Sequence, residues 1–219
     1  MTLLKINNVS KAFKNQSVLK NINLELAEGE HCVMLGQSGS GKSTLLYMIG
    51  ALDRPDNGEI TFKGQNILKF TDESVAKYRN SAIGFMFQYH FLLPSMTCMN
   101  NILLPAKIAE IDVSHIAKRT QYMAKFLGVD HCLSKYPFEL SGGEQQRINL
   151  IRSLSLNPKL LLCDEPTGNL DSGNSKKVLQ LILSFTKEIG CSLLLVTHSN
   201  EVSRCIERKI TIEDGQIIS

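Results

Sequence analysis

The clearest chemical signal in the sequence is a glycine-rich loop of the kind that binds phosphate. Residues 36–43 read Gly-Gln-Ser-Gly-Ser-Gly-Lys-Ser and match the spacing G-x-x-x-x-G-K-[ST]. The glycines let backbone N–H groups surround phosphate oxygens, and a following helix adds its positive N-terminal dipole. In this motif Lys42 is expected to contact the β- and γ-phosphates and the Ser43 hydroxyl to bind Mg²⁺. The alternative, a turn that binds nothing, is disfavoured because a predicted strand precedes the loop and a predicted helix follows it.

Two carboxylates stand at the end of an apolar segment later in the chain. Leu160–Cys163 is followed directly by Asp164 and Glu165. If this segment is a strand of a parallel sheet, its carboxyl end lies at the edge from which the phosphate loop emerges. Asp164 is then suited to hold Mg²⁺, and Glu165 to polarise an attacking water as general base. A strand ending in Asp-Glu usually means only a solvated strand end, but the phosphate loop favours the catalytic interpretation.

A second turn with exposed backbone N–H groups lies between these two motifs. Residues 140–147 read Leu-Ser-Gly-Gly-Glu-Gln-Gln-Arg and open a predicted helix whose apolar positions recur at helical spacing from Ile148 onward. The helix N-terminus offers amide groups and the Ser141 hydroxyl, which predicts a second anion site. The simpler interpretation is a serine N-cap with Glu144 at the third helical position, a capping box. Both interpretations hold together, because a well-capped helix is also a stable platform.

The elements that must position these motifs alternate between strands and helices. Apolar and alternating segments, broken at Gly29 and Gly36, predict strands. The predicted strands are 3–8, 18–26, 30–35, 58–62, 83–87, 160–163 and 192–196. The predicted helices are 41–51 and 174–189, and helical periodicity that begins at about Met99 predicts a helical insert over roughly 89–158. The near-continuous apolar runs of the last two strands suit a largely parallel sheet buried on both faces, which predicts an α/β fold.

Composition narrows the classes of protein to consider. The 219 residues are 43% hydrophobic and 21% charged, which is ordinary for a globular chain and predicts one folding unit. The 24 basic and 21 acidic residues are mixed along the chain, so charge predicts no nucleic-acid partner. Six cysteines without a C-x-x-C pair predict reduced, mostly buried thiols. The apolar runs are far shorter than the roughly 20 residues of a membrane span, so membrane association would come only through partners.

Together, the three motifs resemble the ATPase domains of ATP-binding cassette (ABC) proteins. The phosphate loop, the Leu-Ser-Gly-Gly-Glu-Gln-Gln-Arg signature and the run Asp-Glu-Pro-Thr-Gly-Asn-Leu-Asp at 164–171 stand in that family's order and spacing. The resemblance covers essentially the whole chain. It implies a single ABC ATPase domain over 1–219, with a P-loop NTPase core, an antiparallel β subdomain, and a helical subdomain at about 89–158 inserted in the nucleotide-binding core.

The resemblance also implies a homodimer that binds ATP and Mg²⁺. The two copies would lie head to tail, so that the phosphate loop of one copy and the signature turn of the other enclose each ATP in a two-fold interface. By this resemblance, the positions that contact ATP are Phe13, Gly36, Ser38, Gly39, Ser40, Gly41, Lys42, Ser43, Thr44, Ser141, Gly142, Gly143 and Asp171. The implied metal-binding positions are Ser43, Gln88 and Asp164.

Four single residues acquire roles only through the resemblance. Phe13 lies where the family keeps an aromatic that stacks on adenine, although a core aromatic on a strand is the alternative. Gln88 matches the glutamine that senses the γ-phosphate and Mg²⁺, His198 the histidine that contacts the γ-phosphate, and Asp171 the acidic end of a loop touching the opposite subunit. Glu165, His198 and Gln88 are therefore the predicted catalytic residues of a working ATPase. The remaining histidines lack such a register and are interpreted as structural: His31, His90, His115 and His131.

A finer resemblance rests on residues 88–97, Gln-Tyr-His-Phe-Leu-Leu-Pro-Ser-Met-Thr, and on Asn-Asn-Ile at 100–102. This segment is similar to the ABC subgroup that contains lipoprotein-releasing ATPases and the ATPases of MacB-type exporters. As a free-standing ATPase, the chain is expected to energise lipoprotein release as a peripheral protein on the cytoplasmic face of the bacterial inner membrane, held by integral membrane transporter subunits. The alternatives are a MacB-type exporter, an FtsE-type cell-division complex, and a soluble ABC ATPase acting on DNA or ribosomes.

Overall fold

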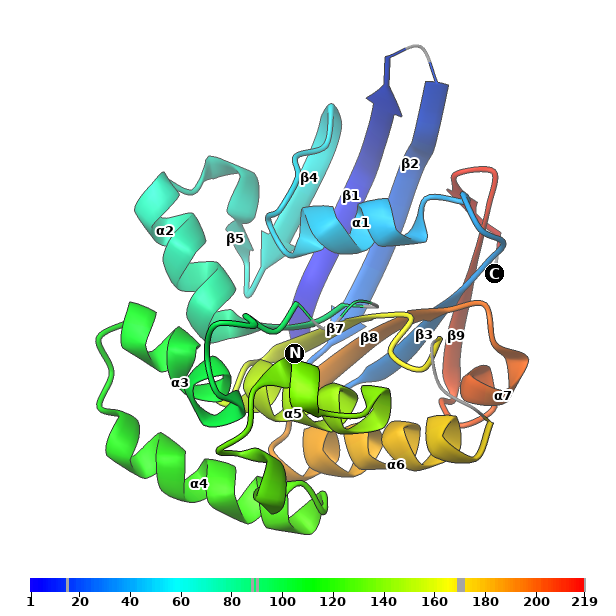
Figure 1. Ribbon diagram of the computed structural model, residues 1–219. Helices are drawn as coiled ribbons and strands as arrows, with labels where there is room; N and C mark the ends of the chain where they lie inside the picture. The colour runs from blue at the N-terminus through cyan, green and yellow to red at the C-terminus, as the bar shows by residue number, and fades with distance from the viewer. Residues whose placement is uncertain (15, 88, 90, 169–171, 219) are drawn as a thin grey trace.

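The computed structural model describes residues 1–14, 16–87, 89, 91–168 and 172–218 (Figure 1). The strands are β1 (Thr2–Phe13), β2 (Gln16–Ala27), β3 (His31–Leu35), β4 (Asn57–Phe62), β5 (Gln65–Asn66), β6 (Ile83–Met86), β7 (Leu160–Asp164), β8 (Ser192–Thr197), β9 (Arg208–Glu213) and β10 (Gln216–Ile217). The helices are α1 (Lys42–Ile49), α2 (Asp72–Lys77), α3 (Cys98–Ile108), α4 (Val113–Phe126), α5 (Gly142–Leu154), α6 (Ser172–Glu188) and α7 (Asn200–Ser203). Shorter helical turns are η1 (Ile67–Lys69), η2 (Tyr78–Ala82), η3 (Asp130–Cys132) and η4 (Pro137–Glu139).

The larger sheet provides the edge at which the sequence motifs were expected to meet. Its strand order is β10-β9-β3-β8-β7-β6, and every pairing is parallel except that of β10 with β9. Leu160 and Leu162 of β7 belong to the core that contains α1, whereas Leu161 and Cys163 belong to the core that contains α5 and α6. This burial on both faces explains the continuous apolar runs and confirms the predicted parallel α/β sheet.

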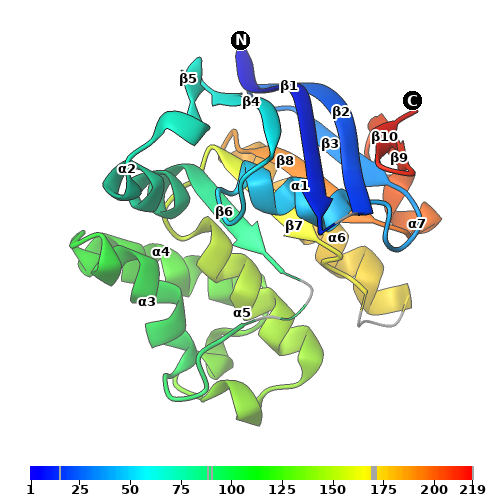
Figure 2. The same ribbon diagram turned by 90° about the horizontal axis from the view of Figure 1, so that it is seen from above.

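The smaller sheet is antiparallel, with the strand order β2-β1-β4-β5. Its buried residues Leu4 and Ile6 share one core with Leu45 and Ile49 of α1. Helix α1 therefore lies between the two sheets, as Figures 1 and 2 show. The end of β1, at Phe13, reaches the start of this helix, because both line the same cavity.

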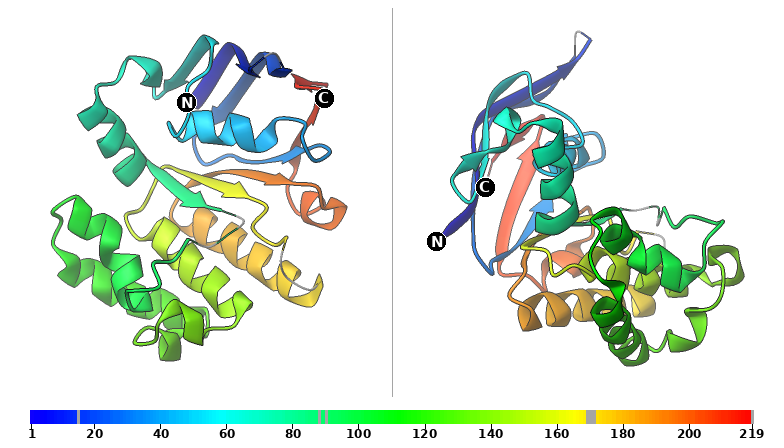
Figure 3. Two further views of the ribbon diagram at one scale, coloured as in Figure 1. Left: turned by 45° about the horizontal axis from the view of Figure 1, so that its top comes forward. Right: turned by 90° about the vertical axis from the view of Figure 1, so that its left-hand side faces the viewer.

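Helices α3, α4 and α5 follow β6 in the chain and gather on the side of the parallel sheet that faces away from the antiparallel sheet (Figure 3). They share a core with α6. The buried side chain of Asn101 fixes the turn that leads into this layer: its oxygen accepts from the Leu93 amide at 2.7 Å, and its nitrogen donates to the carbonyls of Leu93 and Met96 at 3.0 and 3.1 Å. The segment after β6 is thereby tied to α3.

Sequence reasoning missed helix α2 and the strands β9 and β10. Helix α2 has six residues, none of them buried, so no apolar periodicity marks it. Strand β9, Arg-Lys-Ile-Thr-Ile-Glu, has only two buried residues and gains its place by parallel pairing with β3, a contact distant in sequence. Such elements are specified by their partners, which local patterns do not contain.

The cysteines and the hydrophobic segments were the two features that composition addressed. All six cysteines are free, and five of them are buried while Cys205 is exposed, which confirms the predicted reduced and mostly buried thiols. In the described part of the chain, no helix combines the length and the apolar character needed to cross a membrane.

Candidate functional site

The candidate site lies at the carboxyl edge of the parallel sheet. The glycine-rich loop connects β3 to α1, Asp164 ends β7, and His198 follows β8, so three neighbouring strands deliver the predicted groups to one place. These groups line a cavity of about 670 Å³ together with Phe13 and Thr44. The structure thus brings together the phosphate loop, the carboxylate pair and the histidine that the sequence predicted.

The loop requires glycine at both ends of its turn. Gly36 has a φ of 153°, and a Cβ there would overlap the carbonyl oxygen of Ile212. Gly41 has a φ of 102°, and a Cβ there would lie 2.6 Å from Cδ2 of Leu19. A side chain at either position is therefore excluded by backbone conformation and by packing. Ile212 belongs to β9 and Leu19 to β2, so contacts with strands from both sheets help to fix the shape of the loop.

The ammonium group of Lys42 lies at the centre of this loop. Its Nζ donates to the carbonyl oxygens of Gly36 and Gln37 at 2.9 and 2.7 Å and contacts Ser40 Oγ at 3.3 Å. Only 6% of the residue is exposed, and burial lowers the pKa of Lys42, while the nearby Glu165 and Asp164 oppose that shift. The loop therefore already surrounds a cation, which a phosphate placed there would contact directly.

Asp164 is held by hydroxyl groups at both of its oxygens. Ser43 Oγ donates to Oδ1 at 2.9 Å, and the hydroxyl of Tyr47 donates to Oδ2 at 3.1 Å. Burial raises the pKa of Asp164, and the two hydrogen bonds work in the opposite direction. A hydroxyl and a carboxylate thus face each other across the short gap between α1 and β7, and both are hard oxygen donors.

Glu165 is presented by an unusual backbone conformation. Its φ of 46° places a non-glycine residue in the left-handed region, which costs about 1–3 kcal/mol. The carboxylate accepts from Thr197 Oγ1 at 3.0 Å, and Nδ1 of His198 lies 2.6 Å from its other oxygen. The backbone N–H donates to the Val196 carbonyl at 3.0 Å, which anchors the turn to β8. Contacts from β8 therefore fix both the position and the direction of this carboxylate.

Phe13 lies at the rim of the cavity. It ends β1, is 49% exposed, and has Nζ of Lys11 at 5.1 Å from its ring centroid. The alternative interpretation as a core aromatic is therefore wrong. An exposed ring face beside a phosphate loop is available for stacking on a planar base.

The signature turn opens helix α5 as a capping box. Ser141 Oγ donates to Glu144 Oε2 at 2.6 Å, and the Ser141 amide donates to the same oxygen at 2.8 Å. These hydrogen bonds lower the pKa of Glu144 to about 2. A Cβ added to Gly142 would meet nothing within 4 Å, so the chain's own packing does not require glycine there. Among the described residues, the turn is not part of the lining of the cavity at the phosphate loop.

Some predicted site residues lie outside the part of the chain that the structure describes, and the structure adds other residues that the sequence did not predict. Gln88 and Asp171 lie outside the described residues. Sequence reasoning did not find Tyr47 or Thr197, which hold the two carboxylates, or Gln146, which donates to the Pro166 carbonyl. The signal for Tyr47 was its position four residues after Ser43 on the same helix face. No local pattern marks Thr197, because its partner lies on another strand.

Aromatic rings connect Tyr47 to the surface beside α3. Its ring centroid lies 6.0 Å from that of Phe85 and 6.3 Å from that of Phe87, and these two rings stack at 4.0 Å. Phe91, 61% exposed, meets Phe87 edge-on at 5.1 Å. The residue that holds Asp164 therefore packs against rings that line a second cavity, of about 340 Å³, near the surface.

The fold and the site define the class. A glycine-rich loop that leads from a parallel strand into a helix, facing a carboxylate pair at the end of another strand, is the arrangement of P-loop nucleoside triphosphatases. The sequence model of the ABC transporter family matches residues 19–168. The chain belongs to the ABC transporter family, and it is an ABC-type ATPase with the ABC cassette fold.

Similar proteins cover the chain from end to end. It is 40% identical over 216 residues to the lipoprotein-releasing system ATP-binding protein LolD of Cytophaga hutchinsonii, with 99% of each chain covered. It is also 40% identical to LolD of Geobacter metallireducens, covering 100% of this chain and 99% of that protein. The dimeric structure of the bacterial ABC transporter cassette MJ0796 superposes with a TM-score of 0.91 at 36% identity, covering 99% of this chain and 97% of that one. The same cassette bound to ADP and Pi after hydrolysis gives a TM-score of 0.89.

Proposed function

We propose that this ATPase energises the release of lipoproteins from a bacterial inner membrane. The observation that carries this proposal is the similarity, at 38–40% identity over 99–100% of this chain, to LolD proteins of several bacteria. In this proposal the ATPase lies on the cytoplasmic face as a peripheral protein, and integral membrane subunits hold it there. Force generated by ATP-driven closure of the dimer passes to those subunits, so the ATPase itself need not contact the cargo.

The contacts at the cavity support the catalytic roles proposed for its residues. Lys42 binds the β- and γ-phosphates, and Glu165 accepts a proton from the attacking water. Thr197 holds Glu165 from β8, and His198, whose Nδ1 lies 2.6 Å from the same carboxylate, is proposed to contact the γ-phosphate. The ring of Phe13 stacks on adenine. These roles use only groups that line one cavity or hold a group that does.

The oxygen donors at the end of β7 fit Mg²⁺. Ser43 Oγ and Asp164 Oδ1 lie 2.9 Å apart, and Mg²⁺ prefers hard oxygen ligands together with phosphate oxygens and waters. When bound, the ion neutralises charge that develops on the phosphates. Gln88, outside the described residues, is proposed as a further ligand. Tyr47 keeps the Asp164 carboxylate oriented toward Ser43.

Two copies of the chain are proposed to enclose ATP between them. Within one chain the Ser141 turn, which offers backbone N–H groups, does not belong to the cavity at the phosphate loop. A second copy would supply the turn from outside, with Asp171 near the interface, and the solved MJ0796 cassette is a dimer. The open space at Gly142 supports this arrangement, since glycine there serves close approach by something outside the chain.

The Gly142→Ala substitution should separate folding from dimerisation. Gly142 does not have a positive φ, and its added methyl group meets nothing in the chain, so the free energy of unfolding should change by less than about 0.5 kcal/mol. ATP-dependent dimerisation should fall strongly, because the methyl group would press on the nucleotide. Thermal unfolding and analytical ultracentrifugation measure the two effects. Normal dimerisation of this variant would count against the enclosed-ATP arrangement.

The second cavity is the proposed docking surface for the membrane subunits. Its lining includes Phe85, Phe87 and Phe91 together with Leu104 and Ile108 of α3, and it also contains polar side chains such as that of Arg79. Phe91 and Ile108 are 61% and 69% exposed. Exposed apolar side chains at a hollow support a protein-interaction site, and the rings of Phe85 and Phe87 in its lining contact Tyr47 at the proposed ATP site.

The experiment that tests the proposal is affinity purification of Glu165→Gln protein with ATP from detergent-solubilised membranes, followed by mass spectrometry. Recovery of integral membrane subunits with large periplasmic domains, together with lipoproteins, is the expected result. An exporter complex without lipoproteins would favour a MacB-type function, and division proteins an FtsE-type function. Ribosomes or DNA-bound factors without any membrane protein would contradict a transport role while leaving the ATPase intact. A Phe91→Asp variant provides the control, since it should lose the partners and keep ATP binding.

A further inference from the structure

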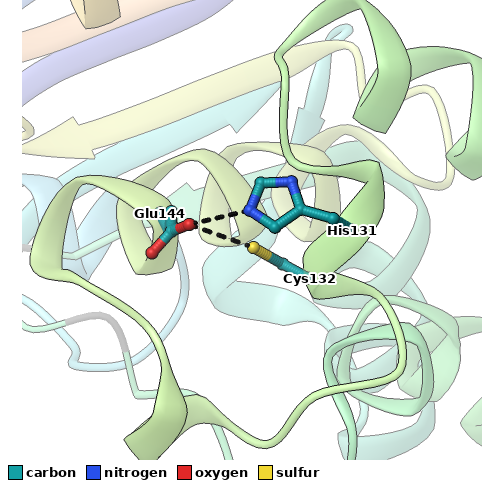
Figure 4. A group of neighbouring side chains, drawn as sticks. All are labelled: His131, Cys132 and Glu144. Atoms are coloured by element: carbon teal, nitrogen blue, oxygen red, sulfur yellow. Dashed lines mark hydrogen bonds and ion pairs between the residues drawn. The ribbon is translucent and has the colours of Figure 1, made fainter.

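Three side chains beside the signature turn direct potential metal ligands at one point (Figure 4). His131 and Cys132 belong to the short turn η3, and Glu144 belongs to the first turn of α5. Nε2 of His131 lies 3.0 Å from Glu144 Oε1, and Sγ of Cys132 lies 3.4 Å from the same oxygen. The three ligand atoms lie within 4.8 Å of one another. They come from η3 and α5, which share one buried core through side chains such as Cys132 and Ile148.

The two oxygens of Glu144 have different tasks. Oε2 accepts from the amide and the hydroxyl of Ser141, at 2.8 and 2.6 Å, and so completes the capping box. Oε1 takes no part in the cap and faces only His131 and Cys132 among the hydrogen bonds of the described residues. Oε1 is therefore free to bind a cation without loss of the contacts that hold the signature turn.

Nitrogen, sulfur and carboxylate oxygen form the ligand set of zinc. Tetrahedral Zn²⁺ with bonds of about 2.0–2.3 Å places its ligands roughly 3.3–3.8 Å apart. The separations of 3.0 and 3.4 Å from Oε1 are close to that range, and His131 and Cys132 have their ligand atoms within 4.8 Å of each other, so side-chain movements can bring all three to one ion. The His131 side chain is 55% exposed, which leaves access for the ion and a fourth position for water. A hard cation such as Mg²⁺ would not select the thiol.

Binding would replace the two hydrogen bonds to Oε1 with one ion and would release one proton, that of the thiol. In the metal-free arrangement, the Cys132 thiol donates to Oε1, and His131 does so in the tautomer with a proton on Nε2. Burial raises the pKa of Cys132 to about 11, with Glu144 adding to the shift and Lys135 opposing it. A bound zinc ion would displace the thiol proton to solvent, while the imidazole would keep its one proton on Nδ1 and bind through Nε2. Oε1 of Glu144 would then bind the zinc ion, while Oε2 would still accept hydrogen bonds from the amide and the hydroxyl of Ser141.

We propose that His131, Cys132 and Glu144 form a zinc site that shares Glu144 with the signature turn. This replaces the structural interpretation given to His131 from the sequence. Because one carboxylate serves both, zinc occupancy and the geometry of the Ser141 turn are linked. Where the turn of one copy closes on the ATP of another, which rests on the proposed function, zinc and ATP-dependent dimerisation influence each other reciprocally.

The first test measures zinc binding to the nucleotide-free protein, prepared reduced and without a histidine tag. Titration against a chromophoric chelator should give one tight zinc ion per chain, and Co²⁺ in its place should give the absorption of a tetrahedral thiolate complex. His131→Ala and Cys132→Ala should each weaken binding by at least about tenfold, since loss of a ligand exceeds the effect of losing an outer-shell partner. The thiolate absorption of the Co²⁺ complex should disappear in Cys132→Ala.

Matched variants separate this site from other histidines and thiols. His115→Ala and Cys205→Ser remove an exposed imidazole and the exposed thiol, and both should leave zinc binding unchanged. His198→Ala removes the other histidine–carboxylate contact and should likewise leave it unchanged. Equal zinc affinity in wild-type, His131→Ala and Cys132→Ala proteins would overturn the proposal, as would a cobalt spectrum without a thiolate band.

The second test concerns the link to the signature turn. In Glu165→Gln protein with ATP, one equivalent of zinc should shift the monomer–dimer equilibrium, and the shift should vanish in the Cys132→Ala background. Zinc binding without any effect on dimerisation would overturn the link alone. Absence of ATP-dependent dimers with and without zinc would instead contradict the proposed function, while the zinc titration of the nucleotide-free chain would still stand.

Discussion

Replacing Glu165 by glutamine should abolish nearly all ATP turnover while ATP binding persists. General-base catalysis contributes typically about 10²–10⁴-fold, and an amide cannot accept the proton of the attacking water. The substitution keeps the size of the side chain, and the amide can still bond to Thr197, so the left-handed turn at 165 should remain in place. ATP-bound dimers should therefore accumulate. Phosphate release, nucleotide binding and size-exclusion chromatography measure the three effects.

The control for this result is a glutamate distant from the cavity. Glu59 is exposed on β4, and Glu59→Gln should leave turnover and dimerisation unchanged. His198→Ala gives a further comparison, because it removes the group 2.6 Å from the Glu165 carboxylate without removing the base itself. Full ATPase activity in the Glu165→Gln protein would contradict the assignment of the general base.

Replacing Lys42 by alanine should weaken ATP binding itself. A hydrogen bond to a charged group contributes roughly 1.5–3 kcal/mol, which corresponds to about a 10- to 150-fold change in affinity. The cost should be at the upper end, because the buried ammonium also joins the carbonyls of Gly36 and Gln37 and so helps to shape the loop. Equilibrium binding of a fluorescent ATP analogue measures the change.

A lysine in the turn between β4 and β5 is the control that distinguishes the loss of charge at the phosphate loop from the loss of any lysine. Lys63 forms a surface ion pair with Glu28 at 3.4 Å, and Lys63→Ala should bind ATP as the wild type does. Lys42→Met keeps most of the side-chain volume, so it should lose affinity like Lys42→Ala while losing less stability than that variant, because only the donor to the Gly36 and Gln37 carbonyls is removed. Normal affinity in both Lys42 variants would show that the phosphate loop is placed wrongly.

The parts of the site that sequence predicted are those written in contiguous residues. The phosphate-loop motif is contained in residues 36–43. Strand β7 is recognisable in the sequence as an apolar run followed by Asp164 and Glu165. Their meeting followed from a rule about parallel sheets, and Ser43 indeed bonds to Asp164. The ABC cassette fold was accordingly predicted in class and in its antiparallel and helical parts.

The parts that sequence did not predict depend on contacts between distant segments. Thr197 becomes important only when β8 lies next to β7, and the cluster around Cys132 forms only when η3 meets α5. Tyr47 is an ordinary helix residue until the structure shows its hydroxyl at Asp164. Helix α2 has no buried residue, so its sequence lacks the apolar periodicity that would predict a helix. Polar contacts across elements leave no regular trace in one sequence.

The glycines of the phosphate loop and of the signature turn differ in whether the chain's own packing excludes a side chain. Gly36 and Gly41 are enclosed by Ile212 and Leu19 of the chain itself, whereas nothing in the chain meets a side chain at Gly142. Substitutions in the first turn should therefore lower the amount of folded protein in a cell, and those at Gly142 should leave abundance unchanged while activity is lost. A mutational scan that measures only the amount of folded protein would therefore score substitutions at Gly142 as neutral. Comparing that scan with one that measures ATPase activity would identify residues that serve contacts with other chains.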